Sequence, residues 1–411
     1  MNKFLMTIFL KYLNIITFIV YSGTLYGLRY IGLAYIPDYK NLLLYLMFLI
    51  SVMYIYIYIL KRGINILREN IILTIFCMFI IIISSLFYNN NPNVLKSCFL
   101  LFGLLMYSIF LSLNYSYKSF INMLFTSQVM VTVGNLLFTL FYPQFGKMIY
   151  EGNLVWKGLF GHKNSLAISM AFGIILSYTV YKFSKSKLRK LISIINIVGA
   201  FLLLMLSGSM TSLIIVIASY IFYKVYKIFN IKINPVAILL CINIIVYSVV
   251  MLGQKYNDLF MRIFNRDLTL TGRVDIWKVI INLIKYKPLV GYGYGGVWNE
   301  RSSIQQYIWS KTFIGMETTH NGFLEWAFQV GVIGLFLFLI VIFIMGKKII
   351  KIKEKNEMLF LISVQYMVYL LIFYITEVVV SPTGYQLFML ITLNVYLNKE
   401  CKKIKKYRSK I

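Results

Sequence analysis

The segment Ile71–Tyr88, IILTIFCMFIIIISSLFY, decides the fold class of this chain because none of its residues is charged. A membrane-spanning helix needs about 20 apolar residues to cross a hydrocarbon core roughly 30 Å thick. Similar runs recur along all 411 residues, of which 60% are hydrophobic and 13% charged. A soluble domain carries about 25% charged residues. Since no segment is polar enough to cover a water-facing surface, composition predicts an all-α integral membrane protein.

Length and apolarity predict about twelve transmembrane helices. They are residues 12–34, 41–60, 71–88, 97–113, 119–141, 165–181, 191–206, 210–228, 235–252, 322–346, 358–377 and 383–398.

The distribution of Lys and Arg predicts the orientation of these spans. Basic clusters follow spans two, four, six, eight, ten and twelve, and an excess of Lys and Arg marks cytoplasmic loops. Both termini are therefore expected in the cytoplasm. The predicted division is spans one to nine in 1–252, a large extracytoplasmic loop with the active site in 253–321, spans ten to twelve in 322–398, and a basic cytoplasmic tail in 399–411. Since topology explains the net charge of +28, no nucleic-acid partner is expected.

Two outer segments, residues 142–164 and 253–321, contain both histidines of the chain, His162 and His320. Long ordered loops are usually functional, and neutral imidazole is a natural general base near pH 7. The alternative is that each histidine only hydrogen-bonds a helix end. The residues alone leave both interpretations open.

Within the large loop, residues 269–288 have the periodicity of an amphipathic helix. This helix is expected to lie in the membrane interface, with Trp277 at headgroup level. Arg273, in its first turn, points either to an anionic headgroup or simply to water. The glycines that follow, including Gly291 and Gly293, let backbone N–H groups approach a phosphate or sugar, although they are also common in hinges.

Charge in this loop favours an anionic substrate, because nine Lys and Arg stand against five Asp and Glu on the predicted outer face. No HExxH motif or close cluster of His, Asp and Glu is present, so no metal site or cofactor is expected. Two ionisable residues inside predicted spans, Arg29 and Glu377, lie toward outer ends and are interpreted as interfacial rather than as a proton relay.

Four motifs then occur in one order. They are WKGLFGHKN at 156–164, Gly272-Arg273 with Trp277, PLVGYG at 288–293, and His320-Asn321 followed by Gly331 and Gly334. Together with the twelve spans and one late outer loop, they resemble the O-antigen ligase and polymerase family over most of the chain. Lys157 stands where an arginine is expected, which keeps the charge but loses the bidentate fork.

The resemblance implies a metal-independent glycosyltransferase in the bacterial cytoplasmic membrane. It would act at the outer face on undecaprenyl-pyrophosphate-linked oligosaccharide, and direct displacement would invert the anomeric centre. The catalytic residues would be His320 as base and Arg273 on the pyrophosphate. The substrate-binding residues would be Lys157, His162, Lys163, Asn164, Arg266, Gly291, Gly293 and Asn321.

The activity favoured by this resemblance is polymerisation of repeat units into a capsular or O-antigen type polysaccharide. The chain is rich in Lys, Ile, Asn and Tyr, as in AT-rich genomes, many of them Gram-positive, and this favours a capsular product. One alternative is a ligase that transfers finished glycan to another acceptor, and another is a flippase or transporter. A transporter would place polar groups near the bilayer midplane, whereas here they gather in outer segments. Expected partners are the lipid-linked oligosaccharide, membrane lipids, and a chain-length regulator and flippase of the same pathway.

Overall fold

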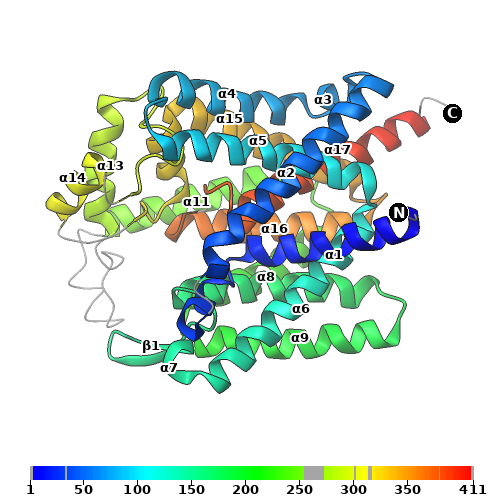
Figure 1. The fold of residues 1–411 in the computed structure, drawn as a ribbon, viewed down its shortest axis with the longest axis horizontal. Helices are drawn as coiled ribbons and strands as arrows, with labels where there is room; N and C mark the ends of the chain where they lie inside the picture. Colours follow the sequence, from blue (N-terminus) through cyan, green and yellow to red (C-terminus); the bar gives the residue numbers. More distant parts are fainter. Residues whose placement is uncertain are drawn as a thin grey trace.

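The fold was analysed in a computed structural model that describes residues 3–32, 35–253, 273–299, 302–312, 317–378 and 380–408. The described residues are almost entirely helical (Figure 1). The first half contains α1 (Lys3–Ser22), η1 (Tyr26–Ile31), α2 (Tyr35–Arg62), α3 (Asn65–Glu69), α4 (Ile71–Tyr88), α5 (Pro92–Asn114), α6 (Tyr117–Phe141), α7 (Pro143–Gly146), β1 (Lys147–Tyr150), β2 (Asn153–Trp156) and α8 (Lys163–Phe183). The second half contains α9 (Lys187–Leu206), α10 (Met210–Ile228), α11 (Pro235–Gly253), α13 (Arg273–Tyr286), α14 (Ser303–Thr312), α15 (Gly322–Ile352), α16 (Glu357–Thr376) and α17 (Tyr385–Arg408).

Eleven of the twelve predicted spans each fall on one of these helices, and the first, 12–34, overlaps α1 and η1. Within the described residues, nine helices are long and apolar enough to cross a membrane: α2, α4, α5, α6, α8, α9, α10, α15 and α16. Shorter apolar stretches lie in α1 and α11. The prediction of an all-α membrane protein is therefore confirmed, while the number of twelve crossings and their orientation remain predictions.

The first predicted span, 12–34, is wrong in its extent because α1 begins earlier and ends at Ser22. Gly23 follows with a φ of +78°, a left-handed conformation that stops the helix at little cost for glycine. The chain then turns into η1, whose Gly27 N–H donates to the Leu159 carbonyl at 2.6 Å. Residues 23–31 thus pack against the segment that precedes α8, and Arg29 lies exposed in η1.

Helix α16 lies at the centre of the bundle (Figure 1). It packs against α8, α10, α11 and α15, and nearly all of its residues are buried. At its first residue, Glu357 pairs with Lys182 and Lys227. At its other end, the chain leaves the helix at Glu377. Because the intervening residues are uncharged and mostly apolar, α16 separates two polar clusters at opposite ends of the bundle.

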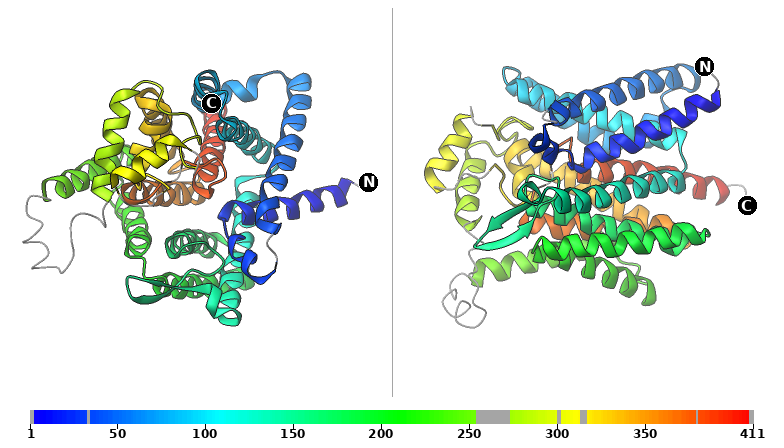
Figure 2. Two further views of the ribbon diagram at one scale, coloured as in Figure 1. Left: turned by 60° about the vertical axis from the view of Figure 1, so that its left-hand side comes forward. Right: turned by 60° about the horizontal axis from the view of Figure 1, so that its bottom comes forward.

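The two ends of the molecule differ in what they carry. Both termini and α3 lie at one end, whereas α7, the hairpin β1–β2, α13 and α14 lie at the other (Figures 1 and 2). The two strands are antiparallel and pair Lys147 with Trp156. Their turn, Glu151 and Gly152, has φ values of 49° and 77°, as a tight right-twisted hairpin requires. We refer to this end as the hairpin end.

A kink in α15 fixes the loop that follows α13. Gly331 has a φ of 72°, and a Cβ there would collide with the Leu289 carbonyl. The break in the helix lets the loop form backbone hydrogen bonds with α15, of which Val332 N–H to the Pro288 carbonyl measures 2.8 Å. The segment 288–299 is therefore a rigid cover on α15 at the hairpin end.

Candidate active site

Four segments meet at the carboxylate of Glu377, directly after α16. Its Oε2 lies 3.1 Å from His320 Nδ1. Its Oε1 accepts from Arg273 NH2 at 3.2 Å and from Asn164 Nδ2 at 3.1 Å. The Arg273 and Glu377 side chains are each 17% exposed and that of His320 is 22% exposed, so all three are largely buried but remain partly accessible. We call these four residues the Glu377 cluster.

Arg273 is the first residue of α13 and ties that helix to the end of α16. Besides its bond to Glu377, its NH1 donates to the Thr376 carbonyl, which is the last helical carbonyl of α16. A cation at a helix C-terminus is favoured because it satisfies unpaired carbonyls and complements the helix dipole. The guanidinium is thereby oriented before any substrate binds.

Opposing effects act on the Glu377 carboxylate. Burial alone would raise its pKa, but the hydrogen bond and electrostatic attraction of His320, followed by the charge of Arg273, hold the pKa below its usual value. Glu377 is therefore ionised at neutral pH. A carboxylate can only accept hydrogen bonds, so the Nδ1 of His320 carries a proton. In the neutral imidazole, Nε2 then has the free lone pair.

The backbone around His320 is held in an uncommon conformation. His320 has a φ of 48°, in the left-handed region that non-glycine residues seldom adopt. The neighbouring Thr319 is fixed through its N–H, which donates to Glu325 at 3.0 Å, and through its carbonyl, which accepts from Trp277 Nε1 at 2.8 Å. On the other side, the Asn321 side chain caps α15 by accepting from Phe323 N–H at 3.1 Å and Leu324 N–H. Strain of this kind is typical of functional sites, and here it aims the imidazole at Glu377.

Glu325 is a second carboxylate that supports this arrangement, and sequence reasoning missed it. Its side chain is fully buried within α15 and accepts from Trp298 Nε1, Gln329 Nε2 and the Thr319 N–H. A single carboxylate in an otherwise apolar span was the signal that could have found it. Glu325 is fully buried and holds the Thr319 N–H beside His320, so we interpret it as a positioning residue.

The hairpin and the start of α8 bring a second histidine to the same region. His162 is the N-cap of α8, and its Nδ1 accepts from the Asn164 N–H at 3.2 Å. Burial lowers the pKa of His162, the charges of Lys163, His320 and Lys157 lower it further, and Glu377 opposes them. These effects require His162 to lie within electrostatic reach of the Glu377 cluster. His162 is therefore neutral at pH 7.

The two lysines beside His162 rest on tyrosine rings. The Lys163 ammonium lies 4.2 Å from the ring centre of Tyr150, and the Lys157 ammonium lies 4.9 Å from that of Tyr30. Such cation–π contacts orient the charge without neutralising it. Positive charge therefore lies beside His162, where Lys163 is buried and Lys157 is partly exposed.

The structure brings together most of the residues predicted from sequence but not all of them. Gly291 and Gly293 are buried, and their N–H groups donate to the Lys287 and Gln329 carbonyls, so they shape the loop and cannot cradle a phosphate. The side chain of Asn321 is used as a helix cap. The predicted Arg266 lies outside the described residues.

The expectation for Trp277 was wrong. Its side chain is 1% exposed and stacks on Tyr247 with ring centres 5.5 Å apart. The apolar face of α13 packs against α15 and the loop after it rather than against lipid, so Trp277 holds the backbone of Thr319.

Apolar helices long enough to cross a membrane, with a buried cluster of ionisable residues at one end, define a multi-pass membrane protein with a polar site near the membrane boundary. Residues 195–339 match a family model described as O-Antigen ligase. The chain is also 36% identical over 100 residues to the exopolysaccharide production protein ExoQ of Rhizobium meliloti (strain 1021). That alignment covers 24% of this chain and 23% of the relative.

These comparisons confirm the resemblance to the O-antigen ligase and polymerase family over the matched part of the chain. The family match includes Arg273 and His320 but neither Glu377 nor His162. Glu377 and Asn164, two of the four cluster residues, therefore lie outside the matched segment, and only the fold brings them to Arg273 and His320.

Proposed function

We propose that this protein polymerises oligosaccharide repeat units carried on undecaprenyl pyrophosphate into a surface polysaccharide. The observation that carries the proposal is the Glu377 cluster, in which one carboxylate orients an imidazole and a guanidinium side by side. A base and an anion-binding group, held together, are what glycosyl transfer from a diphosphate donor requires. The match to an O-Antigen ligase domain and the similarity to an exopolysaccharide production protein support this class of reaction.

In the proposed reaction, a hydroxyl oxygen of the acceptor sugar attacks the anomeric carbon of the donor. The bond between that carbon and the pyrophosphate oxygen breaks, and its electron pair leaves with the polyprenyl pyrophosphate. The hydroxyl proton passes to Nε2 of His320. Because Glu377 accepts from Nδ1, the resulting imidazolium is stabilised at the point where it forms. A single displacement of this kind inverts the anomeric centre.

Arg273, Lys157 and Lys163 supply positive charge for the leaving diphosphate. Arg273 is already oriented by Glu377 and the end of α16, so little reorganisation accompanies donor binding. Lys157 and Lys163 rest on tyrosine faces within reach of the same region. Charge-assisted hydrogen bonds from such groups are about twice as strong as neutral ones.

We place the Glu377 cluster at the outer face of a bacterial cytoplasmic membrane. Support comes from the basic connections, which lie at the opposite end of the bundle from the hairpin (Figure 1). The pairing of Lys182 and Lys227 with Glu357 marks that opposite end. With Lys- and Arg-rich connections in the cytoplasm, the hairpin end faces outward, where lipid-linked repeat units are polymerised.

A ligase is the second candidate, because the description of the matched family model is O-Antigen ligase. The two are separated by giving purified protein a single lipid-linked repeat unit and no other acceptor. A polymerase forms a ladder of lengthening lipid-linked products, whereas a ligase leaves the repeat unit unchanged. A transporter would also leave it unchanged, and in a deletion strain would accumulate repeat units on the inner leaflet rather than the outer one.

A further inference from the structure

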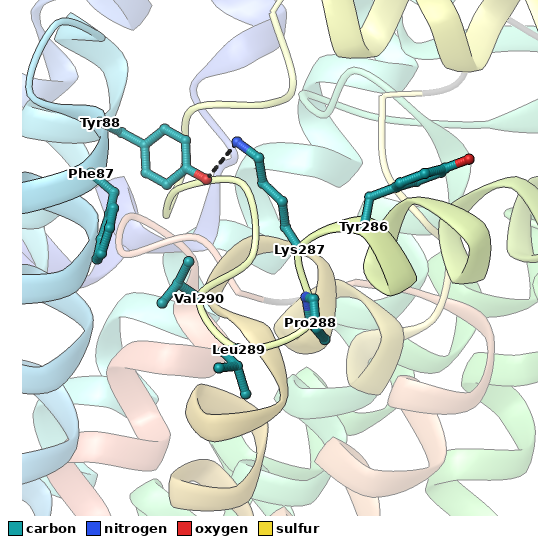
Figure 3. Close-up of a pocket in the computed structure, with 7 residues that line it drawn as sticks. All are labelled: Phe87, Tyr88, Tyr286, Lys287, Pro288, Leu289 and Val290. Atoms are coloured by element: carbon teal, nitrogen blue, oxygen red, sulfur yellow. Dashed lines mark hydrogen bonds between the residues drawn. The ribbon is translucent and has the colours of Figure 1, made fainter.

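A cavity of about 350 Å³ lies at the hairpin end, away from the Glu377 cluster. It is lined by Phe87 and Tyr88 at the end of α4 and by residues 286–290 after α13 (Figure 3). Its walls are mostly apolar, and its polar side-chain groups are the hydroxyls of Tyr88 and Tyr286 and the Lys287 ammonium, which donates to the Tyr88 hydroxyl at 3.3 Å. Phe87 and Leu289 are 60% and 61% exposed, so the cavity opens onto an apolar surface of the bundle. Such a surface suits a hydrocarbon chain.

A larger groove of about 840 Å³ adjoins this cavity. Its described lining residues are neutral, with amide, hydroxyl and aromatic side chains, among them Asn90, Asn93, Tyr292 and Ser302. Neutral amides and hydroxyls both donate and accept, as sugar hydroxyl groups do. Tyrosine rings add a face on which the C–H side of a sugar ring packs. The groove therefore has the chemistry of a saccharide site.

The cavity and the groove meet at Tyr88, which lines both. The Lys287 ammonium stands at this junction, 5.2 Å from the ring centres of Tyr88 and Tyr292. An apolar pocket, a cation and a neutral polar groove thus follow one another along the surface. A lipid joined through phosphate to a saccharide presents its groups in the same order.

We propose that this cavity and groove form a second binding site for a lipid-phosphate-linked saccharide, separate from the Glu377 cluster. The proposal rests on the proposed function, in which this molecule is the acceptor and the Glu377 cluster holds the donor. The loop 292–299 is a shared wall: Gly296 and Val297 line the groove, while Trp298 donates to Glu325, which in turn holds Thr319 beside His320. Because the loop 292–299 separates the groove from the proposed base, an acceptor whose lipid and phosphate lie here extends its saccharide past this loop to bring a hydroxyl to His320.

The test is photo-crosslinking of the full chain in lipid nanodiscs with a diazirine-bearing polyprenyl pyrophosphate that carries one N-acetylhexosamine. We expect two sets of labelled peptides, one from residues 86–93 and 286–299 and one from around Arg273 and Glu377. Lys287→Gln should reduce the first set about tenfold, the cost of one charged hydrogen bond, and leave the second unchanged. Lys285→Gln, an exposed lysine two residues away, is the matched control. Asn93→Trp, at an exposed position, fills the groove and should have the same effect as Lys287→Gln.

Three results would overturn the second site. One is labelling confined to the region around Arg273 and Glu377. Another is equal labelling of the first set in the Lys287→Gln and Lys285→Gln proteins. The third is that an added anionic phospholipid competes away labelling of the first set as effectively as unlabelled probe does, because the pocket would then recognise only lipid.

Crosslinking does not need turnover, so this test separates the second site from the proposed function. His320→Ala should retain both labelled sets while forming no polymer. If both sets appear but wild-type protein never lengthens a repeat unit, polymerisation is wrong and the second site stands. If polymer forms while only the region around Glu377 is labelled, the second site is wrong and polymerisation stands.

Discussion

Replacement of Glu377 by glutamine tests the centre of the site, because it exchanges only one carboxylate oxygen for an NH₂ group. Glu377 accepts from His320 at 3.1 Å, from Arg273 at 3.2 Å and from Asn164 at 3.1 Å, and it is 17% exposed. Glutamine keeps the shape but removes the charge, and its N–H₂ group opposes one of these donors. Hydrogen bonds to charged groups contribute about 1.5–3 kcal/mol each, and partial exposure reduces this. We expect a loss of about 2–4 kcal/mol in stability.

The effect on catalysis should be larger than the effect on folding. Without the carboxylate, His320 is no longer held with its proton on Nδ1, and the imidazolium formed in the reaction loses its counter-charge. We expect turnover to fall by about 10²–10⁴-fold. The assay is conversion of a radiolabelled lipid-linked repeat unit into longer products by purified protein, with thermal unfolding measured in the same detergent.

Two variants at the ends of α16 serve as controls. Glu377→Asp keeps the charge but shortens the side chain, so it should retain more activity than the glutamine variant. Glu357→Gln removes a carboxylate from the opposite end of the same helix, where it pairs with Lys182 and Lys227, and should leave turnover unchanged. The reasoning is refuted if Glu377→Gln folds and turns over like wild type, or if Glu357→Gln slows the reaction equally.

The remaining predictions concern the residues around this cluster. Arg273→Lys should weaken donor binding about tenfold, because an ammonium lacks the planar fork with which the guanidinium contacts Glu377, Thr376 and a phosphate at once. The apparent KM for the donor measures this effect, and an unchanged KM would contradict it. Glu325→Ala should lower the free energy of unfolding by about 3 kcal/mol, because it leaves the buried N–H donors of Trp298 and Thr319 unpaired. A Tm within about 1–2 °C of wild type would contradict this, because a loss of about 3 kcal/mol shifts the Tm further. Gly331→Ala should lower the free energy of unfolding by about 3–5 kcal/mol, because the added Cβ combines a positive φ with a collision against Leu289. Gly63→Ala, at a φ of +74° with open space around it, should lower it by about 1 kcal/mol. Equal losses in denaturant unfolding would rule out the collision. Burial holds the pKa of His162 below 6.5, so between that pKa and 6.5 the unfolded chain binds more protons than the folded chain, and stability falls as the pH drops through this window. His162→Gln should remove this part of the fall in Tm between about pH 7 and pH 5. An unaltered dependence of Tm on pH would contradict the prediction.

The sequence was sufficient to predict the helices because apolar run length is set by membrane thickness rather than by tertiary contacts. The predicted spans 71–88 and 210–228 agree with α4 and α10 at both ends. The prediction for 12–34 failed at Gly23, where the residues that follow remain apolar but pack on Leu159 instead of continuing the helix. Apolar character does not distinguish a lipid-facing helix from a segment that packs on protein.

His320 and Arg273, the two residues predicted from sequence as catalytic, both lie in recognisable motifs, and in the structure both contact Glu377, while their catalytic roles stay predictions. Glu377 could not be assigned its role, since it is 57 positions from His320 in sequence and pairs with it only after α15 and α16 pack. Its position at the end of a span made an interfacial interpretation natural. Trp277 was misassigned for a related reason: an amphipathic pattern shows which face is apolar, but not whether lipid or protein covers it.

Formation of polymer in cells that carry His320→Ala tests the central claim most directly, with the amount of protein in the membrane measured alongside. The proposed function predicts that polymer is lost while single lipid-linked repeat units accumulate on the outer leaflet and the protein is present at its normal level. Polymer of normal length and yield would contradict it, because Nε2 of His320 would then not be the group that accepts the acceptor proton.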